Sequence, residues 1–182
     1  MRALGPRSIS SVLKIVLDVA YVALWIGLVV VIVLAPAALF FHFDLGFLLL
    51  QRRHHFPPID AETRDRILAA RLLFSAIYIA GVLVIIERLR RVFATLTAGD
   101  PFHPENVRRL QLIGAVLAGL ELLRYPQALV FTWLTPDIGP NRGLPPNLAP
   151  NLAAWFGVVV VFVLAEVFRE GARLRREAEL TI

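Results

Sequence analysis

The sequence predicts an all-α integral membrane protein with four transmembrane helices and short helical extensions on the cytoplasmic side. Hydrophobic residues make up 58% of its 182 positions, whereas a soluble domain of this length needs a polar face on nearly every element. Several uncharged runs are also long enough to cross about 30 Å of hydrocarbon. The chain therefore belongs in a lipid bilayer, as a single four-span domain over residues 1–182.

Four hydrophobic segments are the candidate spans, at approximately residues 14–41, 67–88, 109–130 and 150–168. The first contains an uncharged run much longer than the roughly 7–15 residues of a signal-peptide core, so it predicts a membrane anchor. The third is the weakest, because Glu121 and Arg124 interrupt it. It is kept because an even number of spans fits the distribution of basic residues.

Basic residues are divided unequally between the two sides of these spans. Both tails and the loop between the second and third spans carry 12 of the 19 lysines and arginines, and the other side carries 7. Because positive residues accumulate on the cytoplasmic side, both termini are predicted to lie in the cytoplasm. The same sidedness accounts for the net charge of +5, so direct nucleic-acid binding is not expected.

The two outer loops carry little pattern. In the first, residues 42–60, the run "FDLGFLLLQ" fits either an interfacial helix or a strand. The second, "TPDIGPNRGLPPNLAPN", is rich in turn-forming residues and predicts an irregular segment. Asp60 is a candidate helix cap, and no helix breaker follows it before Gly99. A helix over residues 61–97 would be about 55 Å long and must project beyond the membrane.

The projecting part predicts a helical hairpin over residues 87–109. Leu89 and Phe93 belong to one apolar stripe, which needs a partner in water. Gly99 stands where a helix end favours positive φ, and Pro104 suits the first turn of the next helix. Phe102 is expected to fill the gap between the two helices of the hairpin. Arg108 and Arg109 are expected to extend to the membrane surface.

A cytoplasmic helix is predicted at the C-terminus, over residues 166–180. Phe168 and Ala172 share one of its faces, and Val167, Leu174 and Ala178 occupy an adjacent one. Arg173 with Glu177, and Arg175 with Glu179, have the spacing of ion pairs along a helix. This helix either docks on the hairpin stripe or presents a face to a partner, and the two uses are compatible. The candidate partner-binding residues are Leu89, Phe93, Phe102, Phe168 and Leu174.

Two motifs carry a resemblance to a known family. The hairpin motif "GDPFHPENVRRLQLIG" and the ending "AEVFREGARLRREAELTI" occur in the right order and are separated by a hydrophobic pair of spans. Together with the four-span layout they resemble the bacterial inner-membrane family known as domain of unknown function 2975, the YoaS-like proteins. The resemblance implies a small protein without assigned enzymatic activity. It also implies a partner, a small Xre-type helix-turn-helix DNA-binding protein, and hence a membrane-bound regulator of transcription.

Charged residues inside spans are the usual sign of transport or proton relay. Asp18 is explained by Lys14, four residues earlier. Glu121 lies about 16 Å from the start of its span, and Arg124 follows one turn later on the same face. We interpret them as a structural pair. The alternative is a small transporter or channel component built on Glu121 and Arg124, and a third possibility is an assembly subunit of a larger membrane complex.

The sequence offers no pattern for catalysis or for a cofactor. It contains no cysteine, and His54 and His55 have no carboxylate at ligand spacing beside them. Phosphate-binding loops, nucleophile elbows and zinc-protease signatures are missing as well. We therefore expect no catalytic residue, no metal, no cofactor and no enzymatic activity. The expected contacts are the lipid bilayer and a regulatory partner, and homo-oligomerisation stays open.

Overall fold

The computed structural model describes residues 9–40, 61–134 and 149–180. In these ranges the chain forms four helices, α1 (Ile9–Phe40), α3 (Ala61–Thr97), α4 (Pro104–Leu134) and α5 (Leu152–Leu180), and no strand. Each helix contains a segment long and apolar enough to cross a membrane. The predicted fold class, an all-α protein with four membrane-spanning helices, is therefore confirmed. The exact limits of the spans stay predictions.

The apolar surfaces of the outer helices are exposed to the surroundings rather than packed in a core. Only 6% of the most apolar window of α1, and 11% of that of α5, is buried within the protein. Ile26 on α1 and Val159 on α5 are among the exposed side chains. In water so much apolar surface would drive association, whereas in hydrocarbon it is solvated by lipid. The exposed surfaces are thus those of a protein in contact with a bilayer.

Helix α3 is continuous over 37 residues, from Ala61 to Thr97. At 1.5 Å per residue it is about 55 Å long, which exceeds the roughly 30 Å of a hydrocarbon core. The predicted continuous helix is therefore confirmed. The two outer loops, including the run "FDLGFLLLQ", lie outside the described residues.

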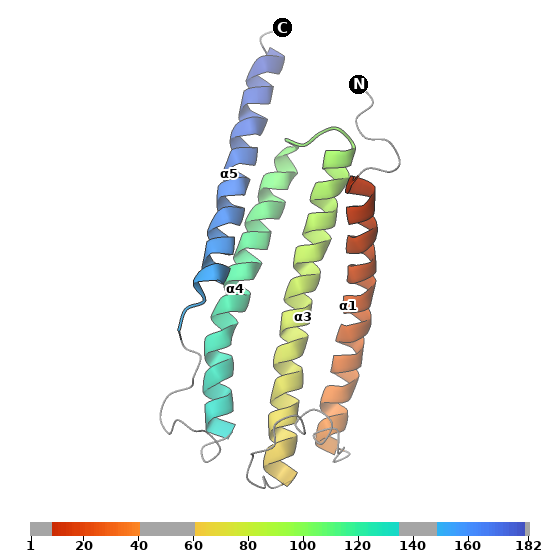
Figure 1. The fold of residues 1–182 in the computed structure, drawn as a ribbon, viewed down its shortest axis with the longest axis vertical. Helices are drawn as coiled ribbons and strands as arrows, with labels where there is room; N and C mark the ends of the chain where they lie inside the picture. Colours follow the sequence, from red (N-terminus) through yellow and green to blue (C-terminus); the bar gives the residue numbers. More distant parts are fainter. Residues whose placement is uncertain (1–8, 41–60, 135–148, 181–182) are drawn as a thin grey trace. The chain divides into compact units, whose positions relative to one another are not determined.

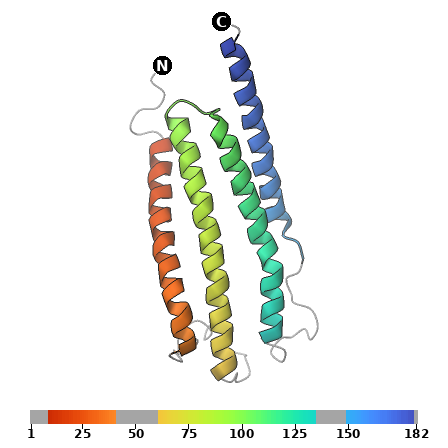
Figure 2. The same ribbon diagram turned by 180° about the vertical axis from the view of Figure 1, so that it is seen from behind.

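The chain divides into two compact units, and each helix except α5 contributes to both. Unit 1 comprises Met1–Trp25, Gly81–Glu121 and Asn151–Ile182. Within it the helix segments lie side by side in the order α1, α3, α4, α5 (Figures 1 and 2). The start of α1, the end of α3, the start of α4 and the end of α5 lie at the same end of this unit. We call it the hairpin end.

The core of unit 1 is a cluster in which α3, α4 and α5 meet. Leu110, Ile113 and Ala165 are its buried centre. Partly buried side chains surround it: Ile85, Leu89, Leu117, Val161 and Phe168. Tertiary packing of this kind holds helices together in a bilayer, where lipid removes the hydrophobic drive for association.

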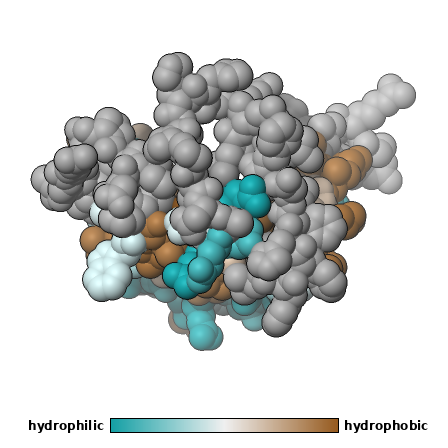
Figure 3. Space-filling model, turned by 90° about the horizontal axis from the view of Figure 1, so that it is seen from below, coloured by the Kyte–Doolittle hydropathy of each residue, from teal (hydrophilic) through white to brown (hydrophobic). Residues whose placement is uncertain are grey.

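Unit 2 comprises Ile26–Ala80 and Leu122–Pro150. In it α3 and α4 meet through Phe74 and Phe131, whose ring centroids are 6.1 Å apart. The guanidinium of Arg71 lies 5.8 Å from the centre of the Phe131 ring, a cation–π contact that compensates a charge near the end of a span. Seen from the end at which α3 begins, the described surface shows hydrophilic side chains beside hydrophobic ones (Figure 3).

The turn between α3 and α4 is built on Gly99, whose φ is +82°. The amide of Gly99 donates to the carbonyl of Leu96 at 3.2 Å, and that of Asp100 donates to Thr95 at 3.0 Å. These two bonds form a Schellman motif, which satisfies the last carbonyls of a helix and places its glycine in the left-handed region. The predictions for Gly99 and for a helix starting at Pro104 are confirmed.

We predict that Gly99→Ala lowers the free energy of unfolding by about 1 kcal/mol, because a Cβ disfavours positive φ. Nothing lies within 4 Å of the added Cβ, so the cost is conformational rather than steric. Gly99→Asn should cost less, since asparagine tolerates this conformation. Thermal unfolding in detergent measures the order of stability of the unchanged protein and the two variants.

Gly119→Ala is the matched control, because Gly119 lies inside α4 and also has open space around it. It should be neutral or slightly stabilising. Equal losses at both positions would contradict the role of the turn.

Candidate functional site

Asn106, in the first turn of α4, is the best-buried polar residue of the hairpin end, with 0% of its surface exposed. Its Nδ2 donates to Thr95 Oγ1 of α3 at 2.7 Å and to the carbonyl of Pro101 at 3.1 Å. Its Oδ1 accepts from Nη1 of Arg109 at 3.0 Å. Both donor hydrogens and the acceptor oxygen therefore have partners, as a buried amide requires.

Arg109 extends this network to a second contact with α3. Its Nη1 also donates to the carbonyl of Arg91 at 3.1 Å, and its Nη2 pairs with the carboxylate of Glu105 one turn earlier. Only 15% of the Arg109 side chain is exposed. The Arg109 guanidinium is therefore held against α3 within the hairpin, whereas Arg108 is exposed. The expectation that both extend to the membrane surface stays a prediction.

The start of α4 is capped by His103. Its carbonyl accepts from the amide of Asn106 at 2.9 Å, and its Nδ1 accepts from the amide of Glu105 at 3.3 Å. These contacts satisfy two amide groups that the first turn of a helix leaves without intrahelical partners. Backbone and side-chain hydrogen bonds thus fix the start of α4, as the Schellman motif fixes the end of α3.

Helix α5 packs against this turn. The ring of Phe102 lies 5.9 Å from that of Phe168, tilted by 58°. A Cβ at position 171 would collide with the Phe102 ring, so Gly171 is what allows the ring to lie on α5. Asp100 forms an ion pair with Arg175. Phe102 was expected between the two helices of the hairpin; the structure shows that its ring contacts α5.

The adjacent face of α5 stays open. Leu174 is 55% exposed and Val167 is 56% exposed, and Ala178 is exposed as well. We call these three residues the tail stripe. By contrast, Ala165 and Ala172 on the packed face are buried. One face of α5 is therefore docked on the hairpin, and the adjacent face is open to a partner, so the helix has a surface for each of the two predicted uses.

Ion pairs border the tail stripe. Arg173 contacts Glu170 at 2.7 Å and Glu177 at 3.4 Å, so the predicted pair of Arg173 with Glu177 is confirmed. Arg175, expected to pair with Glu179, forms its ion pair with Asp100 of the hairpin. The side chain of Glu179 lies outside the described residues. An apolar stripe with a charged border has the anatomy of a small interface, apolar at its centre and polar at its rim.

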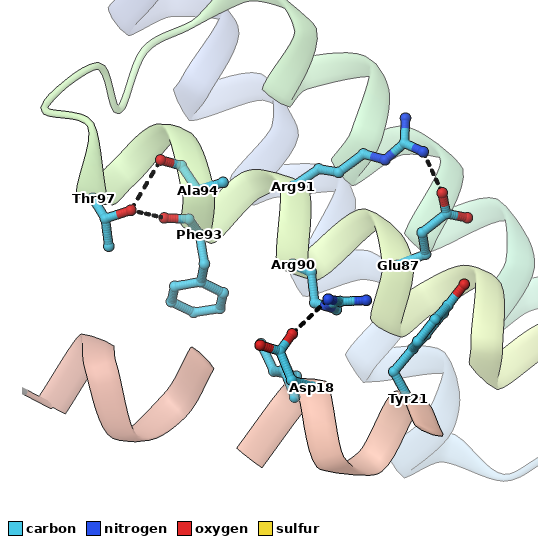
Figure 4. Close-up of a pocket in the computed structure, with 9 residues that line it drawn as sticks. Asp18, Tyr21, Glu87, Arg90, Arg91, Phe93, Ala94 and Thr97 are labelled. Atoms are coloured by element: carbon cyan, nitrogen blue, oxygen red, sulfur yellow. Dashed lines mark hydrogen bonds and ion pairs between the residues drawn. The ribbon is translucent and has the colours of Figure 1, made fainter. Parts of the chain in front are cut away.

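A groove of about 340 Å³ lies between α1 and α3 in the same unit. From α1 it is lined by Leu17, Asp18 and Tyr21, and from α3 by Glu87, Arg90, Arg91, Phe93, Ala94 and Thr97. We call it the α1–α3 groove. Figure 4 shows the Phe93 ring and the charged groups of Arg90 and Asp18 between the two helices.

Arg90 is the main contact across this groove. Its guanidinium lies 4.7 Å from the centre of the Tyr21 ring, and its Nη2 lies 2.6 Å from Asp18 Oδ1. Asp18 Oδ1 is enclosed and receives no well-directed hydrogen bond from the described residues, so the contact is ionic rather than directional. Asp18 thus has a counter-ion on α3. The side chain of Lys14, its expected partner, lies outside the described residues.

The predicted partner-binding residues fall into different surroundings. Leu89 and Phe168 pack on the core cluster of unit 1, Phe102 lies on α5, and Phe93 lines the α1–α3 groove. Leu174 is the member of the set on an uncovered stripe. The predicted single stripe of Leu89 and Phe93 is therefore divided between two surroundings.

The two intramembrane candidates are placed as follows. Glu121 is buried, with 9% of its surface exposed. Arg124 donates from Nη2 to the carbonyl of Ala149 at 3.1 Å, which ties α4 to the segment before α5. Their pairing with each other stays a prediction. Among the described residues no group of three or more His, Cys, Asp or Glu could hold a metal ion, and His54 and His55 lie outside them.

Sequence reasoning missed Asn106 and the contact of Asp18 with Arg90. Asn106 lies within the quoted hairpin motif, and a polar residue just before the apolar positions of a span was a usable signal. Asp18 and Arg90 are far apart in the chain, and no local spacing connects them.

Comparison with known protein families gives a match over most of the chain. A family model described as a protein of unknown function, DUF2975, matches residues 55–182, which contain α3, α4 and α5 with the whole hairpin. No curated protein and no solved structure was found to match the chain.

We predict that Asn106→Ala lowers the free energy of unfolding by about 2–3 kcal/mol, because it leaves buried donors and acceptors without partners. Thr95→Val should cost about 1 kcal/mol. The double variant should cost less than the sum, with a coupling of about 0.5–1.5 kcal/mol, since the two residues share one bond. Unfolding in detergent measures all three.

Thr132→Val is the matched control. Like the hydroxyl of Thr95, the hydroxyl of Thr132 donates to a carbonyl of its own helix, at 2.9 Å, but Thr132 is exposed. It should show no coupling with Asn106→Ala. Strict additivity of Thr95→Val and Asn106→Ala would contradict the network.

Proposed function

Because the chain belongs to the DUF2975 family of proteins of unknown function, we propose its role from the geometry of the hairpin end. It is a non-catalytic, multi-pass membrane protein that binds a regulatory protein on the tail stripe of α5. The observation that carries this proposal is the open face of Val167, Leu174 and Ala178 beside a face that is already packed.

The surroundings of Leu174 argue that this part of α5 lies in water. Exposed charged residues stand on both sides of it, including Glu170, Arg173 and Glu177. So many charges are costly in hydrocarbon. Together with Val167 and Ala178, Leu174 forms a contiguous apolar stripe bordered by ion pairs, which is the pattern of an interface with an apolar centre and a polar rim. A protein partner that covers Leu174 is the simplest reason for it.

The distribution of arginines supports placing the hairpin end and both termini in the cytoplasm. There we propose a small Xre-type helix-turn-helix protein as the partner, on the resemblance of the two motifs described above. Helix α3 supplies the connection to the other surface, because its 37 residues are continuous and end in the hairpin. A displacement of the outer end of α3 would tilt or shift the whole helix and would thereby move its hairpin end.

A second candidate function rests on Glu121. A carboxylate with 9% exposure in a span is the arrangement that transporters and proton relays use. In this reading Glu121 and Arg124 line the path of a solute or proton. The third candidate function is that of an assembly subunit of a larger complex, and no contact among the described residues favours it.

We predict that Leu174→Gln reduces capture of the helix-turn-helix protein at least tenfold, a loss of about 1.4 kcal/mol, because a few central residues carry most of the binding energy of an interface. The measurement is a pull-down in gentle detergent with quantitative mass spectrometry, together with expression of the regulated genes.

Arg176→Gln is the matched control, since Arg176 is exposed on the opposite side of the same helix and the introduced residue is the same. Capture should persist in this variant. Cross-linked dimers that disappear with Leu174→Gln would instead assign the stripe to a second copy of the chain.

Glu121→Gln separates the two leading functions, because it removes the charge while nearly conserving shape. We predict unaltered solute and proton flux in proteoliposomes and retained capture of the partner. A lost flux would favour the transporter and contradict the regulatory role.

A further inference from the structure

The α1–α3 groove has a composition that the proposed regulatory function does not use. Two arginines, Arg90 and Arg91, and two acidic residues, Asp18 and Glu87, are among the residues that line it. Each arginine is paired with one of the carboxylates, and Figure 4 shows the Arg91–Glu87 pair apart from the Arg90–Asp18 pair. Its volume of about 340 Å³ is at the lower end of the roughly 300–1,000 Å³ of ligand pockets. The space suits a headgroup-sized molecule and excludes a whole lipid.

The lining charges restrict the ligand. A simple anion would meet Asp18 and Glu87, and a simple cation would meet the two arginines, so either alone is opposed by like charge. A ligand that carries both charges is matched on both sides. We propose that the α1–α3 groove binds a phosphoethanolamine headgroup, with its phosphate at Arg90 and Arg91 and its primary ammonium at Asp18 and Glu87. The source of this headgroup is the phosphatidylethanolamine of the surrounding bilayer.

Unused hydrogen-bonding capacity supports the assignment. Arg90 and Arg91 each contact one carboxylate oxygen through Nη2, and a guanidinium has five N–H donors. The described residues offer no further acceptor to either group, so donors remain for a phosphate, which arginine binds well. Asp18 Oδ1 is enclosed and lies 2.6 Å from Arg90 Nη2, but the Asp18 side chain as a whole is 40% exposed, so the other carboxylate oxygen is the one that a ligand would reach. A primary ammonium has N–H groups to donate to that oxygen, whereas a quaternary choline has none.

The groove also lies at the level where headgroups are found. Its α1 residues stand in the first turns of the apolar span Ile15–Ala37, and tyrosines such as Tyr21 favour this interface. Val22 follows Asp18 by four residues, so it shares that face of α1, and it is 57% exposed. An acyl chain can therefore run along Val22 while its headgroup occupies the groove.

A ligand in the groove can affect the hairpin, because the two sites share a residue of α3. Arg91 is one of the residues that line the groove, and its backbone carbonyl accepts the bond from Arg109. The lipid site and the Asn106 network thus share one turn of α3. The proposal itself is independent of partner capture, because it concerns the purified protein and a lipid.

The test is native mass spectrometry of the purified full chain in detergent, titrated separately with phosphatidylethanolamine, phosphatidylglycerol and phosphatidylcholine. We expect the ethanolamine lipid to bind about tenfold more tightly than the other two, since only it supplies both charges and N–H donors. Asp18→Asn should abolish this preference. Ala94→Leu should weaken binding of the ethanolamine lipid by a similar factor by filling the groove, while leaving every charged group in place.

Glu166→Gln is the matched control, because Glu166 forms an exposed ion pair with Arg169 on α5, away from the groove, and the preference should persist. Equal binding of phosphatidylglycerol, or a preference that survives both Asp18→Asn and Ala94→Leu, would overturn the proposal. Soluble phosphoethanolamine should compete weakly and inorganic phosphate less. Equal competition by phosphate would show recognition of the anion alone, and soluble phosphoethanolamine binding as tightly as the lipid would refute the bilayer as the source.

Discussion

The hairpin end depends on one buried carboxamide. Asn106 has no exposed surface, and an amide in such a place costs roughly 1–3 kcal/mol for each unmade bond. Its three contacts reach the last turns of α3, the connecting turn and the next turn of α4. The spacing of the two helices and the path of the chain between them are therefore limited to arrangements in which all three partners remain within bonding distance.

The rotation of α5 follows from that restraint. A fixed turn presents Asp100 and Phe102 at defined positions, and α5 meets them with Arg175, Phe168 and the Cβ-free surface of Gly171. Once these contacts set which face of α5 is packed, they also set which face is open. The exposure of Leu174 is in this sense a consequence of the hairpin, and the proposed interface inherits its rigidity from a hydrogen-bond network on another helix.

Hydrophobic length and helix-ending chemistry made much of the fold predictable. The four helices, the long α3 and the positive φ of Gly99 all follow from local patterns. The sequence did not predict which side chains contact one another across different helices. Helical periodicity placed Leu89 and Phe93 in one stripe, yet neighbouring helices divide that stripe between the core cluster and the α1–α3 groove. The bond of Arg109 to α3 was not predicted, because local sequence does not reveal that a carbonyl of α3 lies within its reach.

The contact between Asp18 and Arg90 has a consequence for biogenesis. Helix α1 precedes α3 in the chain, so the carboxylate leaves the ribosome before the guanidinium that neutralises it has been synthesised. Until α3 inserts, only water and the neighbouring Lys14 can compensate the charge of Asp18, which keeps the beginning of α1 near the membrane surface. Association of these two helices therefore follows the synthesis of α3, and its completion creates the α1–α3 groove.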